Sequence, residues 1–137
     1  MKIKLDDGAF TPTRAFSTDA GLDLRSRTTV MIWPGTSETF STGVHVEIPS
    51  GCYGKIEGKS GLNTIHHVTP TGGVIDEGYT GEIMVTLRNF GRTGYTVKRG
   101  DKIAQLLIIP CLTPELEIVD ELEETERGTG GFGSTGR

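Results

Sequence analysis

The chain has 137 residues, 34% of them hydrophobic, and a net charge of −4 at neutral pH. This length allows one domain with one ordinary core, and the negative charge argues against a basic stripe that binds duplex nucleic acid. Its two cysteines exclude a disulfide framework, no apolar run reaches membrane-spanning length, and no secretory leader is recognisable. We therefore expect a soluble, cytoplasmic protein that binds neither nucleic acid nor a membrane.

Short alternating runs of apolar and polar residues predict strands along most of the chain. In chain order, strands are expected at residues 3–5, 28–33, 44–48, 53–57, 82–88, 102–110 and 116–119. The alternation is clearest in 44–48 and 82–88. The segment 102–110 is apolar on both faces, which is typical of a strand in the centre of a sheet.

Turn sequences such as WPGT, IPSG, NFGRTG and KRGD separate these segments. A helix of roughly one or two turns is expected only in SGLNTIHH, which begins at Ser60. The sequence thus predicts an all-β fold, a jelly-roll-like barrel or sandwich, over residues 1–120. Residues 121–137, an acidic linker and a glycine-rich segment, are expected to form a flexible C-terminal arm outside the core.

Functional residue types recur in short segments where a strand or turn would not require them. These segments are AGLDL (20–24), GKSGL (58–62), GVIDEGYTGE (73–82), RGDKIAQLLI (99–108) and RGTGGFGSTGR (127–137). Their order and spacing resemble the signature motifs of the trimeric dUTPase family, from about residue 20 to the C-terminus. The resemblance implies a β jelly-roll that forms a homotrimer and hydrolyses dUTP to dUMP and pyrophosphate with Mg²⁺. It also implies that each active site lies at a subunit boundary, with the C-terminal arm supplied by a neighbouring chain.

Asp76 is the expected catalytic base. A carboxylate can orient and deprotonate the water that attacks the α-phosphorus in line with the leaving pyrophosphate. On its own, an aspartate in a DEG turn is as readily explained as a turn residue. The resemblance to the dUTPase family favours the catalytic interpretation.

By the same resemblance, the segment around Asp76 binds the nucleoside. Gly73, Val74 and Ile75 are expected to recognise the uracil edge through their backbone groups, and Met84 to contact the substrate. Because cytosine reverses the donor and acceptor pattern of uracil, a fixed backbone site would leave buried groups unpaired with it. Tyr79 is expected beneath the deoxyribose, although a half-buried strand tyrosine is the simpler reading of that residue alone.

The remaining motifs are expected to bind the phosphates and to close the site. The residues concerned are Lys59, Ser60, Gly61, Gln105, Arg127, Phe132, Gly133, Ser134 and Thr135. Within this set, the resemblance places Arg127 at the γ-phosphate and Phe132 over the uracil ring. Asp23 is expected in the surroundings of Mg²⁺ through water, with no direct protein ligand, because Mg²⁺ keeps waters and takes ligands from substrate phosphates.

The sequence departs from the family pattern at Lys59, Pro70 and Thr80. Lys59 stands where the family has arginine, which keeps the charge but loses the bidentate fork. Pro70 stands near the position where many family members have an asparagine. Thr80 stands where family members frequently have an arginine or a glutamine.

Two alternatives stay open at this point. One is a relative of the same fold that resembles dCTP deaminase, and the other is a non-catalytic regulatory or protein-binding homologue. GVIDEGYTGE and GGFGSTG favour the hydrolase over the deaminase, and the presence of Asp76, Tyr79 and Phe132 together argues against loss of catalysis.

Overall fold

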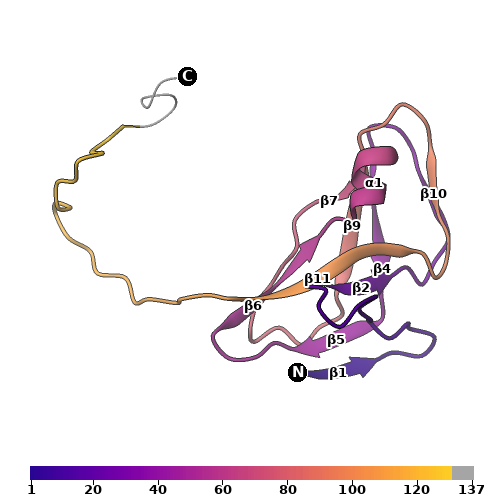
Figure 1. Ribbon diagram of the computed structural model, residues 1–137, viewed down its shortest axis with the longest axis horizontal. Helices are drawn as coiled ribbons and strands as arrows, with labels where there is room; N and C mark the ends of the chain where they lie inside the picture. The colour runs from indigo at the N-terminus through magenta and orange to yellow at the C-terminus, as the bar shows by residue number, and fades with distance from the viewer. Residues whose placement is uncertain (131–137) are drawn as a thin grey trace.

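The computed structural model describes residues 1–130, and its regular secondary structure consists of strands and one short helix (Figure 1). In chain order the elements are β1 (Lys2–Leu5), β2 (Leu22–Arg25), β3 (Val30–Ile32), β4 (Ser37–Ser41), β5 (Val44–Glu47), β6 (Cys52–Glu57), α1 (Ser60–Ile65), β7 (Val68–Pro70), β8 (Val74–Ile75), β9 (Met84–Asn89), β10 (Tyr95–Val97) and β11 (Lys102–Pro110). The all-β class and the short helix at Ser60 are therefore confirmed.

All strand pairs in the described part of the chain are antiparallel. The largest sheet has the order β2-β11-β6-β8, and a second has the order β4-β9-β7. Two further pairs are β1 with β5 and β10 with β3. The expectation that 102–110 is central is confirmed, since β11 lies between β2 and β6 over its nine residues.

One hydrophobic core lies between these sheets, and every strand except β1 contributes to it. Its largest fully buried side chains include Phe40, Leu24, Ile32, Ile83, Leu87, Ile103 and Leu106. In β9 the inward residues Val85 and Leu87 are buried, whereas Thr86 between them is half-buried and Met84 and Arg88 on either side are exposed. The alternation read from the sequence thus marks the two faces of this strand.

The strand expected at 116–119 is not formed. After β11 the chain leaves the body of the molecule as a long extended segment (Figure 1). In it the side chains of Leu116 and Ile118 are 94% and 99% exposed. Alternation predicts a strand only where a partner strand can pair with it, and no other strand of the described chain reaches this segment. The division of the chain at residue 120 stays a prediction.

Candidate active site

A cavity of about 280 Å³ opens at the edge of the largest sheet, beside β8 and the turn that follows it. We call it the hairpin pocket. Its lining residues are Ile56, Pro70, Thr71, Gly73, Val74, Ile75, Asp76, Tyr79, Glu82, Met84, Val85 and Thr86. Gly73, Val74, Ile75, Asp76, Tyr79 and Met84, which the sequence assigned to the nucleoside and to the catalytic base, are therefore gathered around one cavity.

The backbone of β8 is fixed against β6. Gly54 and Lys55 pair with Ile75 and Val74, and the Ile56 amide donates to the Gly73 carbonyl at 2.8 Å. Gly73 has a φ of 111°, and a Cβ there would lie 2.6 Å from the Cβ of Ile56. Only glycine fits this position, because any side chain would push the pocket's backbone away from β6.

The turn after β8 presents Asp76 on its exposed side. The Tyr79 amide donates to the Asp76 carbonyl at 3.0 Å, and the Tyr79 hydroxyl donates to the Glu82 carbonyl at 2.9 Å. The Tyr79 ring packs so closely over Gly81 that a Cβ there would lie 2.5 Å from the hydroxyl oxygen. Tyr79 is thus held within its own turn, with 44% of the residue exposed.

Of the departures from the family pattern, Pro70 lies at this pocket, and Thr80 lines a second, separate cavity together with His45. Pro70 lines the hairpin pocket at the end of β7, where it has no backbone N–H to offer. Thr80 lies in the turn itself, and its carbonyl is 3.0 Å from the Nδ1 of His45.

A second group of predicted residues surrounds Asp23, and we call it the Asp23 cluster: Asp23, Lys59, Lys102 and Gln105. Asp23 lies on β2 directly opposite Gln105 on β11, and it is 5% exposed. Its carboxylate forms ion pairs with the Nζ of Lys59 and, at 2.6 Å, with the Nζ of Lys102. The Gln105 side-chain amide donates to the Gly58 carbonyl at 3.0 Å, so this polar group has a partner within the chain.

The charge of this cluster is settled by two opposing effects. Burial raises the pKa of the Asp23 carboxyl, but hydrogen bonds from Lys102 and Lys59 outweigh it and hold that pKa below its ordinary value. Asp23 is therefore ionised at neutral pH. Lys59, which stands where the family has arginine, still carries a positive charge and forms an ion pair with Asp23. Ser60 and Gly61 follow directly as the exposed first residues of α1.

Within one chain, no member of the Asp23 cluster lines the hairpin pocket. Asp23 on β2 and the pocket strand β8 are at the two edges of the same sheet, and three strand spacings correspond to about 14 Å. Gln105 is nearer to the pocket, because it pairs with Glu57 beside the lining residue Ile56. Lys59, Ser60, Gly61 and Gln105, the residues predicted to bind phosphate, are not among the residues that line the pocket.

The tail residues lie elsewhere. Arg127 belongs to the extended segment that leaves the body, and its Nε donates to the Gly130 carbonyl at 3.1 Å. The predicted residues Phe132, Gly133, Ser134 and Thr135 lie outside the described residues.

Sequence reasoning missed Glu82 and Lys102 as parts of these sites. Both were read as the polar face or the end of a strand, and only the folded chain brings Glu82 to the pocket and Lys102 to Asp23. Over residues 1–130, the structure contains no group of three or more His, Cys, Asp or Glu side chains able to hold a metal ion. None of the helices in that range is long and apolar enough to cross a membrane.

Residues 8–136 match the family model described as dUTPase. The chain belongs to the dUTPase family. A deoxyuridine 5'-triphosphate nucleotidohydrolase of Mus musculus is 44% identical over 135 residues, which cover 98% of this chain and 83% of that relative.

Solved structures of dUTPases share the fold. A mutant dUTPase of Staphylococcus bacteriophage 80alpha, solved with dUpNHpp, superimposes with a TM-score of 0.92 and 32% identity over 99% of this chain and 98% of that one. A mutant dUTPase of phage phi11 of S. aureus, solved to describe the coordination of a structural Mg(II) ion, has a TM-score of 0.82 and 31% identity. The superposition covers 90% of this chain and 98% of the phage phi11 chain.

Proposed function

We propose that this chain is a dUTP diphosphatase, which hydrolyses dUTP to dUMP and pyrophosphate. The observation that carries this function is the hairpin pocket, where Gly73, Asp76 and Tyr79 of a single motif line one cavity in a member of the dUTPase family. Such a reaction keeps uracil out of DNA and supplies dUMP for thymidylate synthesis.

Asp76 is proposed to act as the general base. Its carboxylate is exposed at the rim of the pocket, where it can accept a hydrogen bond from water and take its proton as the oxygen attacks the α-phosphorus. The leaving group is pyrophosphate, so the water has to stand on the opposite side of the phosphorus. The buried Ile75 before Asp76 anchors the turn that sets this direction.

Uracil recognition is assigned to the backbone of 73–75. Backbone amides and carbonyls are fixed by the pairing of β8 with β6, so they present one pattern of donors and acceptors to the base. Cytosine would leave groups in this pattern unpaired, at a cost of roughly 1–3 kcal/mol for each buried group. Tyr79 and Met84, which also line the pocket, are proposed to contact the sugar and the base.

Mg²⁺ is the cofactor used by this family, and the residues present fit a metal bound mainly through the substrate. The Asp23 carboxylate already pairs with two lysines, and residues 1–130 offer no cage of three ligands. A Mg²⁺ ion held by phosphate oxygens and water matches this donor set, with Asp23 reaching only its water shell. When bound, the ion neutralises negative charge on the triphosphate.

None of Lys59, Ser60, Gly61 and Gln105 lines the hairpin pocket of its own chain. This supports a shared site, in which these residues bind the phosphates of a substrate held in the pocket of another chain. The extended segment supports the same proposal, because Leu112, Leu116 and Ile118 are more than nine-tenths exposed and need apolar partners. We therefore assign a homotrimer in which Arg127, Phe132, Gly133, Ser134 and Thr135 close a neighbouring site.

The test is pyrophosphate release measured side by side for dUTP, dTTP, dCTP and UTP with Mg²⁺. Turnover of dUTP alone is the expected result. Ammonia release from dCTP would instead indicate the deaminase alternative. Absence of turnover with every nucleotide, from a folded protein that still binds dUTP, would indicate the regulatory alternative.

A further inference from the structure

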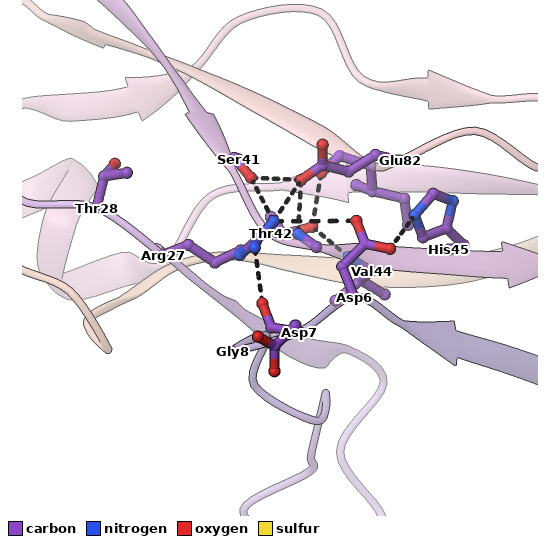
Figure 2. Close-up of polar contacts among 12 residues, drawn as sticks. Asp6, Asp7, Gly8, Arg27, Thr28, Ser41, Thr42, Val44, His45 and Glu82 are labelled. Carbon is purple, nitrogen blue, oxygen red and sulfur yellow. Dashed lines mark hydrogen bonds and ion pairs between the residues drawn. The ribbon is translucent and has the colours of Figure 1, made fainter.

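A network of polar side chains and backbone groups surrounds Asp6, Arg27 and Glu82 (Figure 2). It joins the end of β1, the turn between β4 and β5, and the segment 80–83. Its members are Asp6, Asp7, Arg27, Ser41, Thr42, Gly43, His45, Thr80 and Glu82. Glu82 lines the hairpin pocket. The other members of the network have been given no role in substrate binding or catalysis above.

His45 on β5 stands between two hydrogen-bond acceptors. Its Nδ1 is 3.0 Å from the carbonyl oxygen of Thr80, and its Nε2 is 3.2 Å from Oδ1 of Asp6. A carbonyl oxygen and an ionised carboxylate can only accept. Both ring nitrogens therefore have to donate, which is possible only in the positively charged imidazolium. We call this arrangement the His45 clamp: His45 with the Asp6 carboxylate and the Thr80 carbonyl.

The charges around the ring agree with that form. The bond to the Thr80 carbonyl and then the bond to Asp6 raise the pKa of the His45 imidazole, against burial and the charge of Lys4. Lys4 is opposite His45 on β1 and lies 3.7 Å from Asp6, while Arg27 contacts Asp6 at 3.9 Å. Farther along the same pair of strands, Lys2 and Glu47 neutralise each other at 2.9 Å.

The clamp acts at the junction between the turn that carries Asp76 and Tyr79 and the residues Glu82 and Ile83, which are held by other bonds to the β4–β5 region. On one side of Thr80, the Tyr79 amide and hydroxyl bond only within the turn, to Asp76 and Glu82. On the other side, the Glu82 carboxylate accepts from the Ser41 hydroxyl at 2.5 Å and from the Gly43 amide at 2.6 Å. Between them, the Thr80 carbonyl is tied to β5 by His45.

We propose that His45 is a positioning residue for dUTP hydrolysis: it ties the Thr80 carbonyl to Asp6 and so fixes the turn that presents Asp76 and Tyr79 to the hairpin pocket. This inference rests on the proposed function. When the ring loses a proton, one of its two bonds is lost. The turn then becomes free to shift, and activity falls as the pH rises through the pKa of His45.

Three variants test the inference by steady-state kinetics with dUTP and Mg²⁺ between pH 6 and 9. His45→Ala should lower kcat about tenfold at the acidic end, because small displacements of a catalytic group are costly, with a smaller change in KM. His45→Arg, which keeps two donors and a permanent charge, should restore most of kcat and remove the alkaline fall that His45 causes. The control Glu47→Gln lies on the same strand in an exposed ion pair with Lys2 and should match the wild type.

A second measurement does not depend on activity. Nuclear magnetic resonance of the labelled, fully assembled protein should show the His45 ring and the Gly81 amide titrating with one midpoint, because that amide shares the Thr80 peptide group. Asp6→Asn should move this midpoint to lower pH, since it removes the negative charge beside Nε2.

The kinetic and resonance measurements distinguish failure of the proposed dUTP hydrolysis from failure of the positioning role of His45. A wild-type protein that does not hydrolyse dUTP would contradict the proposed function, and the resonance titration would still decide whether the clamp exists. A wild type that does hydrolyse dUTP, with unchanged kcat in His45→Ala or an unchanged alkaline fall in His45→Arg, would overturn the positioning role. A Gly81 amide that ignores the His45 titration would overturn it as well.

Discussion

Ile75 and Asp76 are neighbours with opposite surroundings, since Ile75 is 8% exposed and Asp76 stands at the surface of the same turn. A buried apolar residue next to an exposed carboxylate fixes the backbone while leaving the acid free to meet water. This arrangement suits a base that has to act on a water molecule rather than pair with a neighbouring cation.

Asp76→Asn should abolish hydrolysis and leave dUTP binding nearly unchanged. The amide has almost the same size but cannot take the proton, and loss of a general base costs about 10²–10⁴-fold in turnover. Pyrophosphate release and calorimetric binding of a non-hydrolysable analogue measure the two effects. The matched control is Glu77→Gln in the same turn, whose carboxylate accepts from the Gly51 amide at 2.9 Å. An Asp76→Asn enzyme with a tenth of wild-type turnover would remove this residue from the role.

The Asp23 cluster gives a pH prediction for stability. The pKa of Asp23 is lower in the folded protein than its ordinary value of 3.8, so its ion pairs stabilise the fold above that value. This contribution is lost as the pH falls through the lower, folded pKa. Asp23→Asn should therefore lower the free energy of unfolding by about 3 kcal/mol at pH 7, and by progressively less below about pH 4.

Urea unfolding of both proteins from pH 7 down to pH 2.5 measures that difference. The control is Asp7→Asn, because Asp7 is exposed and contributes only its backbone carbonyl to Arg27. A difference between wild type and Asp23→Asn that stays constant over the whole pH range would contradict the assigned ion pairs.

Among the elements, those with a long or regular pattern could be predicted from sequence. β11 could be predicted because apolar residues occupy both faces of its nine-residue segment. β9 could be predicted because the buried Val85 and Leu87 alternate with less buried neighbours. β4 and β8 could not be read in this way. β4 has one fully buried residue, Phe40, and β8 has only two residues, so its existence depends on pairing with β6.

The residues of the candidate site also fall into two groups, those that could be predicted from sequence and those that could not. The grouping of Asp76 and Tyr79 at one cavity was predictable because one motif keeps them together in the chain. Lys102 and His45 were not, because their partners Asp23 and Thr80 are brought to them only by strand pairing and turn geometry. Local alternation marks such residues merely as the polar face of a strand.

Deleting residues 128–137 should leave the fold intact and abolish most turnover. No buried core residue lies beyond β11 in the described part of the chain, so the core loses nothing. The deletion removes Phe132 and the proposed phosphate contacts of Ser134 and Thr135 together. Phe132→Ala alone should be milder, since it removes one stack on the base worth roughly 1–3 kcal/mol. Circular dichroism and pyrophosphate release measure the two properties, and a truncated protein with full activity would show that the arm has no part in catalysis.

For the whole molecule, the distribution of apolar surface supports the proposed homotrimer. Leu112, Leu116 and Ile118 are exposed on the extended segment, and Ile3 and Leu5 are partly exposed on β1. A water-exposed chain of this kind needs a partner to cover it. Closed cyclic symmetry provides one equivalent partner surface for each subunit.

Light scattering should therefore give three times the 14.7 kDa mass of the chain. Mixing inactive Asp76→Asn subunits with subunits that carry the 128–137 deletion offers a sharper test. Neither protein should turn over dUTP alone, and mixed trimers should regain part of the activity because each subunit supplies what the other lacks. A fully active monomer would contradict the shared site.

The place of β11 in the middle of its sheet also has a consequence for how the molecule acquires its structure. In the described chain, β2 and β6 are connected within the sheet through β11. Pairing β2 with β11 closes a loop of roughly 80 residues, and the entropy cost of that closure precedes the gain from strand pairing. Chains dominated by such distant pairings fold in about milliseconds to seconds rather than microseconds. During synthesis the sheet therefore stays incomplete until the residues of β11, up to Pro110, are available to pair with both β2 and β6.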